Sequence, residues 1–399
     1  MRDRIYLDHA ATTPLDPAVL EAMLPYLHGG WGNPSSVYAE AQEARRGLET
    51  ARRSIGDILR CRPQDVILTS GGTEADNLAL LGSAQAARRA GRGNYVITTQ
   101  IEHHAVLHAT ERLEQDGFNV TYLPVDGEGF IDLEELEAAV SDETVLVSIM
   151  YVNNEVGTIE PIEEAVRIVK AKNPRTLFHT DAVQAAGIRD VNVDRLGVDL
   201  LSLSAHKFYG PKGVGALYVR PRTPLAAQLS GGSQEKNRRA GTENVAGAVG
   251  MATALSLAYD EFDVRNAQYS ALRDRLMVGL PEVIEGVHIT GPLDADRRAT
   301  NNFSCCFEGI EGEAILMALD LAGIACSSGS ACTTGSLEPS HVLTAMGVPE
   351  QLARGSVRFT VGMDNTLEQM DRVLAVLPEI VERLRSLSPA WRERRAAAS

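Results

Sequence analysis

The middle of the chain alternates short apolar runs with helical segments, and this alternation constrains the fold more than any other feature. The β-rich runs between residues 65 and 220 are 66–69, 95–99, 120–123, 145–150, 177–180 and 200–204, with helical stretches such as 76–90 and 162–172 between them. Strands this apolar, separated by helices, indicate a mainly parallel sheet covered by helices on both faces. Ligands of such sheets bind at the carboxyl ends of the strands.

The character of the sequence changes after about residue 261. A helical segment over 266–280 precedes β-like runs at 287–290 and 302–307, a helix over 313–322, a Gly/Ser-rich loop, a run at 357–360 and a last helix from Thr366. A chain of 399 residues is also longer than one ordinary core requires. We therefore predict a large domain over 16–260, and a smaller α+β domain formed by 1–15 and 261–399.

Charge and hydropathy narrow the classes of partner. The formal net charge of −15 argues against nucleic acid or an anionic membrane surface as a partner. We find no run near the roughly 20 consecutive apolar residues that span a bilayer. The N-terminus leads directly into a strand-like segment, without the apolar core of a signal peptide. We therefore expect a cytoplasmic protein.

The chain has five cysteines, Cys61, Cys305, Cys306, Cys326 and Cys332. An odd number in a large chain does not indicate a disulfide framework, and the spacings do not match paired Cys-x-x-Cys zinc ligands. We therefore expect no metal site, and we ask instead which cysteine reacts.

A glycine-containing turn follows the run that ends at Thr69. Residues 70–77 read SGGTEADN, and glycines allow backbone N–H groups to approach an anion at the positive end of the following helix. This favours phosphate binding. An ordinary strand-to-helix turn with Thr73 as the N-cap is about as probable from this motif alone.

Lys207 lies directly after the run 200–204, among small and polar residues in SAHKFYGPKG. Burial lowers the pKa of a lysine, which makes its amine a usable nucleophile for carbonyl compounds. Taken alone, Lys207 is better interpreted as a lysine whose side chain extends from a loop into solvent. Beside a phosphate-binding loop, the functional reading is favoured.

Asp181 follows another run, in FHTDAVQ. At a strand end its carboxylate is suited to the protonated nitrogen of a pyridine ring, with Gln184 near the ring oxygen. The alternative is that Asp181 caps the next helix. A lysine, a phosphate loop and an aspartate at one sheet edge together describe a pyridoxal 5′-phosphate (PLP) site.

With these motifs, the chain resembles the cysteine desulfurases of the NifS/IscS type, within the class V aminotransferase family. The resemblance covers nearly the whole chain, in YLDHAATTP (6–14), GNPSS (32–36), EHHAV (102–106), VNNE (152–155), RAGTEN (239–244) and SSGSACTTGSLEPS (327–340). The last run is the most diagnostic, because few other PLP enzymes carry a cysteine at the position of Cys332.

The resemblance implies the fold of PLP-dependent transferases, with a mainly parallel sheet of seven strands in the large domain. It also implies roles for individual residues. Catalytic roles fall to Cys332, Lys207 and His103; cofactor-binding roles to Gly72, Thr73, His103, Asn154, Asp181, Gln184, Ser204, His206, Lys207 and Thr242; and substrate-binding roles to Arg358 and Asn33. Thr242 resembles a residue that reaches the phosphate of a neighbouring subunit, which implies a homodimer.

The implied reaction converts L-cysteine into L-alanine and leaves the sulfur on Cys332 as a persulfide, for an acceptor such as an iron–sulfur scaffold protein. Related PLP lyases that act on selenocysteine or cysteine sulfinate are the alternative, and a scaffold without activity is a third. Cys305 and Cys306 point to opposite faces of one run and are read as core residues. Cys326 is either an inert thiol or a second sulfur acceptor.

Overall fold

The computed structural model of the chain describes residues 4–329, 339–388 and 391. Its centre is a seven-stranded sheet with the order β2-β8-β7-β6-β5-β3-β4. These strands are β2 (Val66–Thr69), β3 (Tyr95–Thr99), β4 (Asn119–Leu123), β5 (Thr144–Ser148), β6 (Leu177–Asp181), β7 (Leu200–Ser204) and β8 (Gly215–Val219). Strand β8 runs antiparallel to both of its neighbours, β2 and β7, and the other neighbouring pairs of this sheet are parallel. The predicted α/β architecture with a mainly parallel sheet is confirmed.

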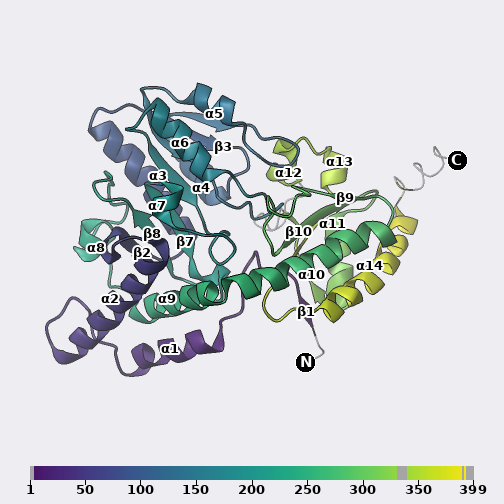
Figure 1. Ribbon diagram of the computed structural model, residues 1–399, viewed down its shortest axis with the longest axis horizontal. Coiled ribbons are helices and arrows are strands. Elements are labelled where there is room, and N and C mark those ends of the chain that lie inside the picture. Colours follow the sequence, from purple (N-terminus) through teal and green to yellow (C-terminus); the bar gives the residue numbers. More distant parts are fainter. Residues whose placement is uncertain (1–3, 330–338, 389–390, 392–399) are drawn as a thin grey trace.

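Helices cover both faces of this sheet (Figure 1). One face carries α3 (Gly72–Arg89) and α4 (His104–Gln115), and the other carries α6 (Ile162–Lys172) and α9 (Val245–Asp260). Successive strand residues point to opposite faces, so Leu177 packs in the core under α3 while Phe178 packs in the core on the other side. Burial on both faces explains why the strands read as unbroken apolar runs.

A smaller layer follows the large sheet in the chain. It contains the antiparallel sheet β12-β10-β9, formed by β9 (Val287–Ile289), β10 (Asn302–Phe307) and β12 (Ser356–Thr360). Its helices are α10 (Phe262–Val283), α11 (Gly312–Leu321) and α14 (Leu367–Leu387). The long helix α10 runs from the large sheet to the small one and packs against α14 (Figure 1).

The N-terminal arm joins the small layer. Strand β1 (Ile5–Tyr6) pairs in parallel with β11 (Ile324–Ala325), and the N–H of Thr360 donates to the carbonyl oxygen of Leu7 at 2.8 Å. A small domain formed by both ends of the chain requires this crossing. The domain boundaries themselves stay a prediction.

The remaining elements connect these layers. They are α1 (Pro17–His28), α2 (Ala39–Leu59), α5 (Leu133–Ala139), α7 (Val193–Leu196), α8 (Gln234–Asn237), α12 (His341–Ala345), α13 (Glu350–Ala353) and the 3-10 turns η1 (Pro63–Asp65) and η2 (Ala205–Lys207). Helices α1 and α2 pack on α9. Among the residues that the structure describes, none of the helices combines the length and apolar character that crossing a bilayer requires.

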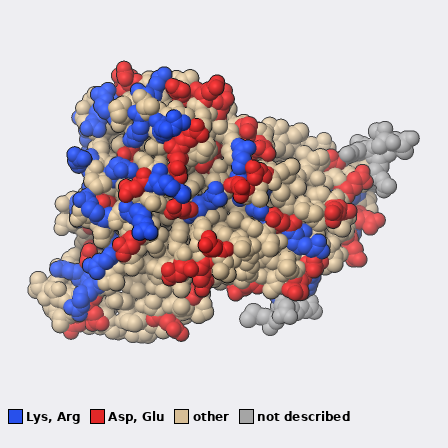
Figure 2. All heavy atoms as spheres, in the orientation of Figure 1, with Lys and Arg blue, Asp and Glu red and all other residues tan. Residues whose placement is uncertain are grey.

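Two local alternatives from the sequence are wrong. Helix α3 begins at Gly72 with Gly71 as its N-cap, so Thr73 lies inside the first turn and does not cap it. Asp181 ends β6, and the next helix, α7, is capped by Asn192. By contrast, the last helix starts at Thr366 as predicted, and Thr366 caps α14, because its side chain accepts a hydrogen bond from the N–H of Gln369. Basic and acidic side chains are interspersed on the face shown in Figure 2.

Candidate active site

Lys207 lies in the turn directly after β7, at the carboxyl edge of the sheet. Its Nζ donates to the carbonyl oxygens of Ala10 at 2.5 Å and Ala11 at 2.8 Å. The side chain amide of Gln184 donates to the same oxygen of Ala10 at 2.9 Å. The N-terminal arm therefore closes over the sheet edge and holds the amine of Lys207 in place.

Asp181 lies at the end of the neighbouring strand β6 and is 6% exposed. Its Oδ1 accepts a hydrogen bond from the N–H of Val183 at 2.9 Å. Burial raises the pKa of Asp181 to about 6, while the N–H of Val183 and the charge of Lys207 act in the opposite direction. The sheet edge thus carries a buried carboxylate near an amine, as the sequence predicts.

The amino end of α3 faces the same edge. Its first N–H groups have no acceptors within the helix, which makes this end favourable for an anion. A Cβ at position 72 would lie 2.7 Å from Cγ2 of Val183, so glycine allows the turn to approach the segment after Asp181. Ser204 is buried at the end of β7, next to the turn, whereas Thr73 is exposed. The structure brings Gly72 and Ser204 together, since a Cβ at position 72 would lie 3.5 Å from Cβ of Ser204.

Two histidines border the amine of Lys207. Burial, followed by the charge of Lys207, lowers the pKa of His103 to about 4 and that of His206 to about 4. Nδ1 of His103 accepts from the N–H of Ala105 at 3.1 Å, so the neutral ring carries its proton on Nε2. His206 forms a hydrogen bond through Nδ1 with Oγ1 of Thr12 at 3.1 Å. Both imidazoles are neutral near pH 7.

Arg358 on β12 is 3% exposed and links the small sheet to the large one. Its guanidinium donates to the carbonyl oxygen of Asn154 at 2.7 Å and to Oδ1 of Asp8 at 3.0 Å. Within the described part of the chain, no acceptor reaches its Nε, although the atom is buried. A buried cation with an unused N–H group is suited to an anionic ligand.

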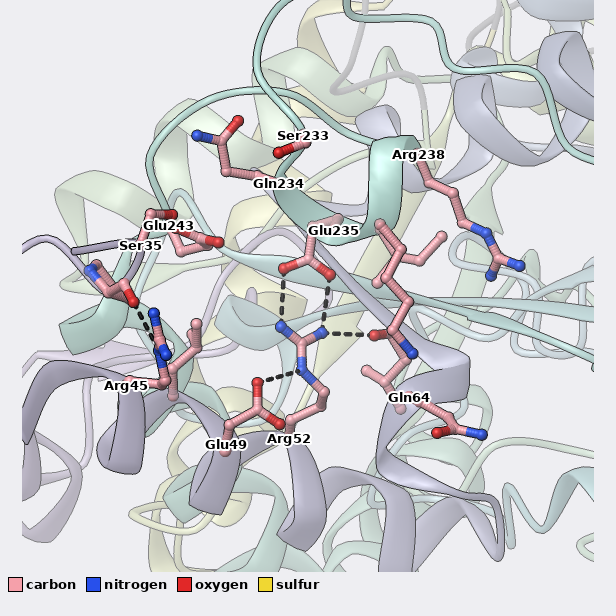
Figure 3. A pocket seen from close by; sticks show the side chains of 15 residues that line it. Ser35, Arg45, Glu49, Arg52, Gln64, Ser233, Gln234, Glu235, Arg238 and Glu243 are labelled. Carbon is pink, nitrogen blue, oxygen red and sulfur yellow. Dashed lines mark hydrogen bonds and ion pairs between the residues drawn. The ribbon is translucent and has the colours of Figure 1, made fainter. Parts of the chain in front are cut away.

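Asn33 and Thr242 are both exposed, and their neighbours line a different pocket (Figure 3). Oδ1 of Asn33 accepts from the N–H of Ser35 at 2.9 Å, within its own loop. The pocket has a volume of about 320 Å³, and its described lining includes Ser35 and Glu243 but not Lys207 or Arg358. In this single chain, the structure therefore does not bring Asn33 or Thr242 to the guanidinium of Arg358.

A buried ion pair supports this pocket and the segment that leads to Thr242. Figure 3 shows the guanidinium of Arg52 against Glu235, with hydrogen bonds of 2.8 and 2.9 Å. Glu235, Lys236 and Asn237 adopt φ values of 46°, 58° and 63°, in the left-handed region that L-residues rarely occupy. Arg52 on α2 holds Glu235, the first residue of this turn, and the ion pair thereby offsets the strain of the turn.

Cys332 lies outside the described residues. The other four cysteines are free thiols, and burial raises the pKa of each, to about 12 for Cys61 and Cys306. Cys305 and Cys306 are fully buried on opposite sides of β10, which confirms their reading as core residues. The raised pKa of Cys326 disfavours the thiolate that a sulfur acceptor requires.

Sequence reasoning did not single out several residues of the site. Asp8 contacts Arg358, and the carbonyl oxygen of Ala10 contacts Lys207. The buried pair Asp76 and His179 lies next to the strand ends. In each contact the two partners come from different parts of the chain. Of these residues, only His179 could have been predicted from the sequence, because it precedes Asp181 by two residues and so lies on the same face of β6. The other contacts depend on tertiary packing.

The chain is similar to known proteins over almost its full length. The profile of the family named "Aminotransferase class-V" matches residues 5–373. A cysteine desulfurase IscS of Dictyoglomus turgidum is 50% identical over 393 residues, which cover 98% of each chain. Among solved structures, a NifS-like protein superposes with a TM-score of 0.90 at 40% identity, over 96% of this chain and 100% of the other. The structure titled "SspA in complex with cysteine" superposes with a TM-score of 0.77 at 34% identity, over 90% of this chain and 99% of that one.

The matches agree with the fold and with the residues gathered at the sheet edge. Both the family profile and the curated relative extend across the large and small sheets, so the similarity is not confined to one part of the chain. The chain belongs to the class V aminotransferase family and, within it, to the cysteine desulfurases.

Proposed function

We propose that the protein converts L-cysteine into L-alanine with PLP bound at Lys207, and that the sulfur passes to Cys332 as a persulfide. The observation that carries this proposal is the meeting of Lys207, Asp181 and the amino end of α3 at one sheet edge. The cysteine desulfurase relatives, and the similar structure solved in complex with cysteine, support the choice of substrate.

The residues present fit PLP. The buried carboxylate of Asp181 matches a protonated ring nitrogen, and the turn at Gly72, with Ser204, His206 and Thr73, matches a phosphate group. Gln184 and Asn154 would contact the ring substituents, and His103 would stack on the ring. When bound, PLP supplies an electron sink for the bonds at the α-carbon of the substrate.

The chain itself supplies binding and proton transfer. Arg358 would bind the substrate carboxylate, because its buried Nε still has an N–H group to donate. The amine of Lys207, which two carbonyl oxygens hold at the sheet edge, would take the α-proton once it is free of the cofactor. His103 is neutral and carries its proton on Nε2, so it can donate that proton during the reaction.

Sulfur transfer requires a thiolate. The Cys332 thiolate would attack the sulfur of the substrate, forming the S–S bond as the bond between sulfur and Cβ breaks. The electron pair of the broken bond takes a proton on Cβ, so that L-cysteine and one enzyme thiol give L-alanine and one enzyme persulfide. The four described cysteines are held as thiols, which supports Cys332 as the nucleophile.

The surface of α1 supports a homodimer. Leu20, Leu24 and Leu27 lie on one side of this helix and are 44%, 39% and 54% exposed, and Trp31 close after it is 69% exposed. A homodimer would also fit the role that the resemblance implies for Thr242, which is exposed in the single chain and would reach the phosphate of a neighbouring subunit. Sedimentation should show a dimer for wild type and a monomer for Leu24→Asp, with Leu321→Asp on α11 as the exposed control.

The persulfide would then pass to an acceptor protein, such as an iron–sulfur scaffold. The free thiols of the described cysteines are typical of a reducing compartment, which supports a cytoplasmic location.

The proposal is tested with purified protein, L-cysteine and a reductant. Wild type should release alanine and sulfide in equal amounts, Cys332→Ala should release neither, and Cys326→Ala should behave as wild type. Alanine and sulfide from Cys332→Ala would contradict the persulfide step. They would instead favour a lyase of the selenocysteine or cysteine sulfinate type, which needs no cysteine nucleophile.

A further inference from the structure

A second buried carboxylate lies next to Asp181, and the reaction described above does not use it. Asp76, in the first turns of α3, is 1% exposed and faces the strand ends. Leu177 on β6, Leu200 on β7 and Leu146 on β5 pack under α3, so residues two and four positions further along these strands share that face. These residues include His179, Asp181, Ser202 and Ser148.

His179 lies at the centre of this group and is fully buried. Its Nδ1 is hydrogen-bonded with Oγ of Ser148 at 2.8 Å, and its Nε2 with Oγ of Ser202 at 3.0 Å. Oδ1 of Asp76 lies 3.6 Å from Nε2 of His179 and has no hydrogen-bond partner in the described part of the chain. The group is therefore a polar cluster enclosed between α3 and the sheet.

Among the residues that the structure describes, this cluster has no positive charge that could balance an ionised Asp76. Burial lowers the pKa of His179 to about 3, so the imidazole is neutral. The other ionisable groups that act on Asp76 are the carboxyls of Asp181 and Glu102, and neither of them can supply a positive charge. Lys207 is the cation that acts on Asp181. An unpaired carboxylate is costly to bury, and a second one beside Asp181 is more so.

The protonation states of two neighbouring buried carboxyls depend on each other. Burial first, and then the charge of Asp181, raises the pKa of Asp76 well above its usual range, and a hydrogen bond from Ser202 offsets only part of this. Asp181 gains stabilisation as an anion from the N–H of Val183 and from Lys207. One negative charge shared between the two groups would therefore reside on Asp181.

We propose that Asp76 is a positioning residue that holds a proton as a neutral carboxylic acid beside Asp181, so that Asp181 alone carries the negative charge offered to the ring nitrogen of the cofactor. The inference rests on the proposed function for its connection to PLP. The protonated state of Asp76 follows from the cluster itself and can be tested on the chain without cofactor.

The test is infrared difference spectroscopy of protein labelled with ¹³C at the aspartate side chain carboxyl. Wild type at pH 7.5, without PLP, should show the C=O stretching band of a protonated aspartic acid, and Asp76→Asn should lose it. Asp65→Asn is the matched control, because Asp65 is buried but ion-paired with Arg62 at 3.0 Å, and this variant should keep the band. If Asp76→Asn does not fold, Asp76→Ser replaces it. The absence of the band in wild type, or its persistence in the Asp76 variant, overturns the proposal.

PLP binding gives a second readout that separates this inference from the proposed function. Since asparagine reproduces an uncharged acid, the dissociation constant of PLP should change less than about threefold in Asp76→Asn, whereas Asp181→Asn should weaken binding by about tenfold or more. A loss of tenfold or more in Asp76→Asn would indicate an ionised Asp76 and overturn the inference. A wild-type protein that binds no PLP would overturn the proposed function, while the infrared result would still decide the state of Asp76.

Discussion

The guanidinium of Arg358 donates to Oδ1 of Asp8 at 3.0 Å, which joins the small sheet to the N-terminal arm. The arm is itself fixed to the same strand, since the N–H of Thr360 donates to the carbonyl oxygen of Leu7. The carboxyl of Asp8 therefore orients the residue that we propose binds the substrate. Burial raises the pKa of Asp8, while the charge of Arg358 lowers it.

Arg358→Lys is expected to raise the KM for L-cysteine by about 100-fold, because an ammonium group cannot reproduce the planar set of N–H donors. Asp8→Asn keeps the acceptor oxygen but removes its charge, and should raise KM by roughly fivefold with a smaller change in kcat. Steady-state kinetics with alanine as the measured product checks both. Arg383→Lys on the exposed face of α14 is the control. An unchanged KM in Arg358→Lys would remove this residue from the substrate site.

Lys207 is expected to form the covalent link with PLP. After reduction with borohydride, peptide mass spectrometry should find the phosphopyridoxyl group on the peptide that contains Lys207. Lys207→Ala should carry no label. Lys212→Ala should carry a full label, because Lys212 is exposed five residues further along. A label on any other lysine of wild type would contradict the assignment.

Alkylation should distinguish Cys332 from the other cysteines. Iodoacetamide reacts with thiolates, and burial raises the thiol pKa of Cys61, Cys305, Cys306 and Cys326. At pH 7.5 and short reaction times, peptide mass spectrometry of the folded protein should find the label mainly on Cys332. Denatured protein, in which all five cysteines react, gives the reference. Cys326 labelled as fast as Cys332 would revive the second sulfur acceptor.

Glu102→Gln should stabilise the fold at alkaline pH. Burial raises the pKa of Glu102 from 4.5 to about 8, so the stability that its protonated form contributes is complete below pH 4.5 and is lost as the pH rises through 8. Glutamine keeps an oxygen to accept from Oγ1 of Thr99 and from the N–H of Met150, and it cannot ionise.

The free energy of unfolding, from urea titrations at pH 5 and pH 8.5, tests this expectation. The difference between Glu102→Gln and wild type should shift by about 2–4 kcal/mol in favour of the variant over this range. Glu137→Gln on the exposed surface of α5 should show no such shift. Parallel pH profiles for wild type and Glu102→Gln would exclude an ionisation of Glu102 in this range.

The sequence predicted the large sheet because its strands are buried on both faces and therefore appear as apolar runs. Strand β8 was not predicted, and it runs antiparallel between β2 and β7. No local signal gives the direction of a strand, since direction depends on how the connecting segments pack. The start of α3 also differs from the prediction. The helix begins at Gly72 and not at residue 76, because the glycines of the turn permit its close approach to Val183.

The sequence by itself determined the chemistry that this protein can carry. Lys207 and the turn at Gly72 each follow a strand of one mainly parallel sheet, and Asp181 ends a third strand of it. The carboxyl ends of parallel strands meet at a single edge. The tertiary structure alone decided what surrounds them. The arm places the carbonyl oxygen of Ala10 on Lys207 and the carboxyl of Asp8 on Arg358, across separations of 197 and 350 residues. Such contacts, like that of Asp76 with His179, form only when distant segments pack together, and packing is a property of the whole fold rather than of any local pattern.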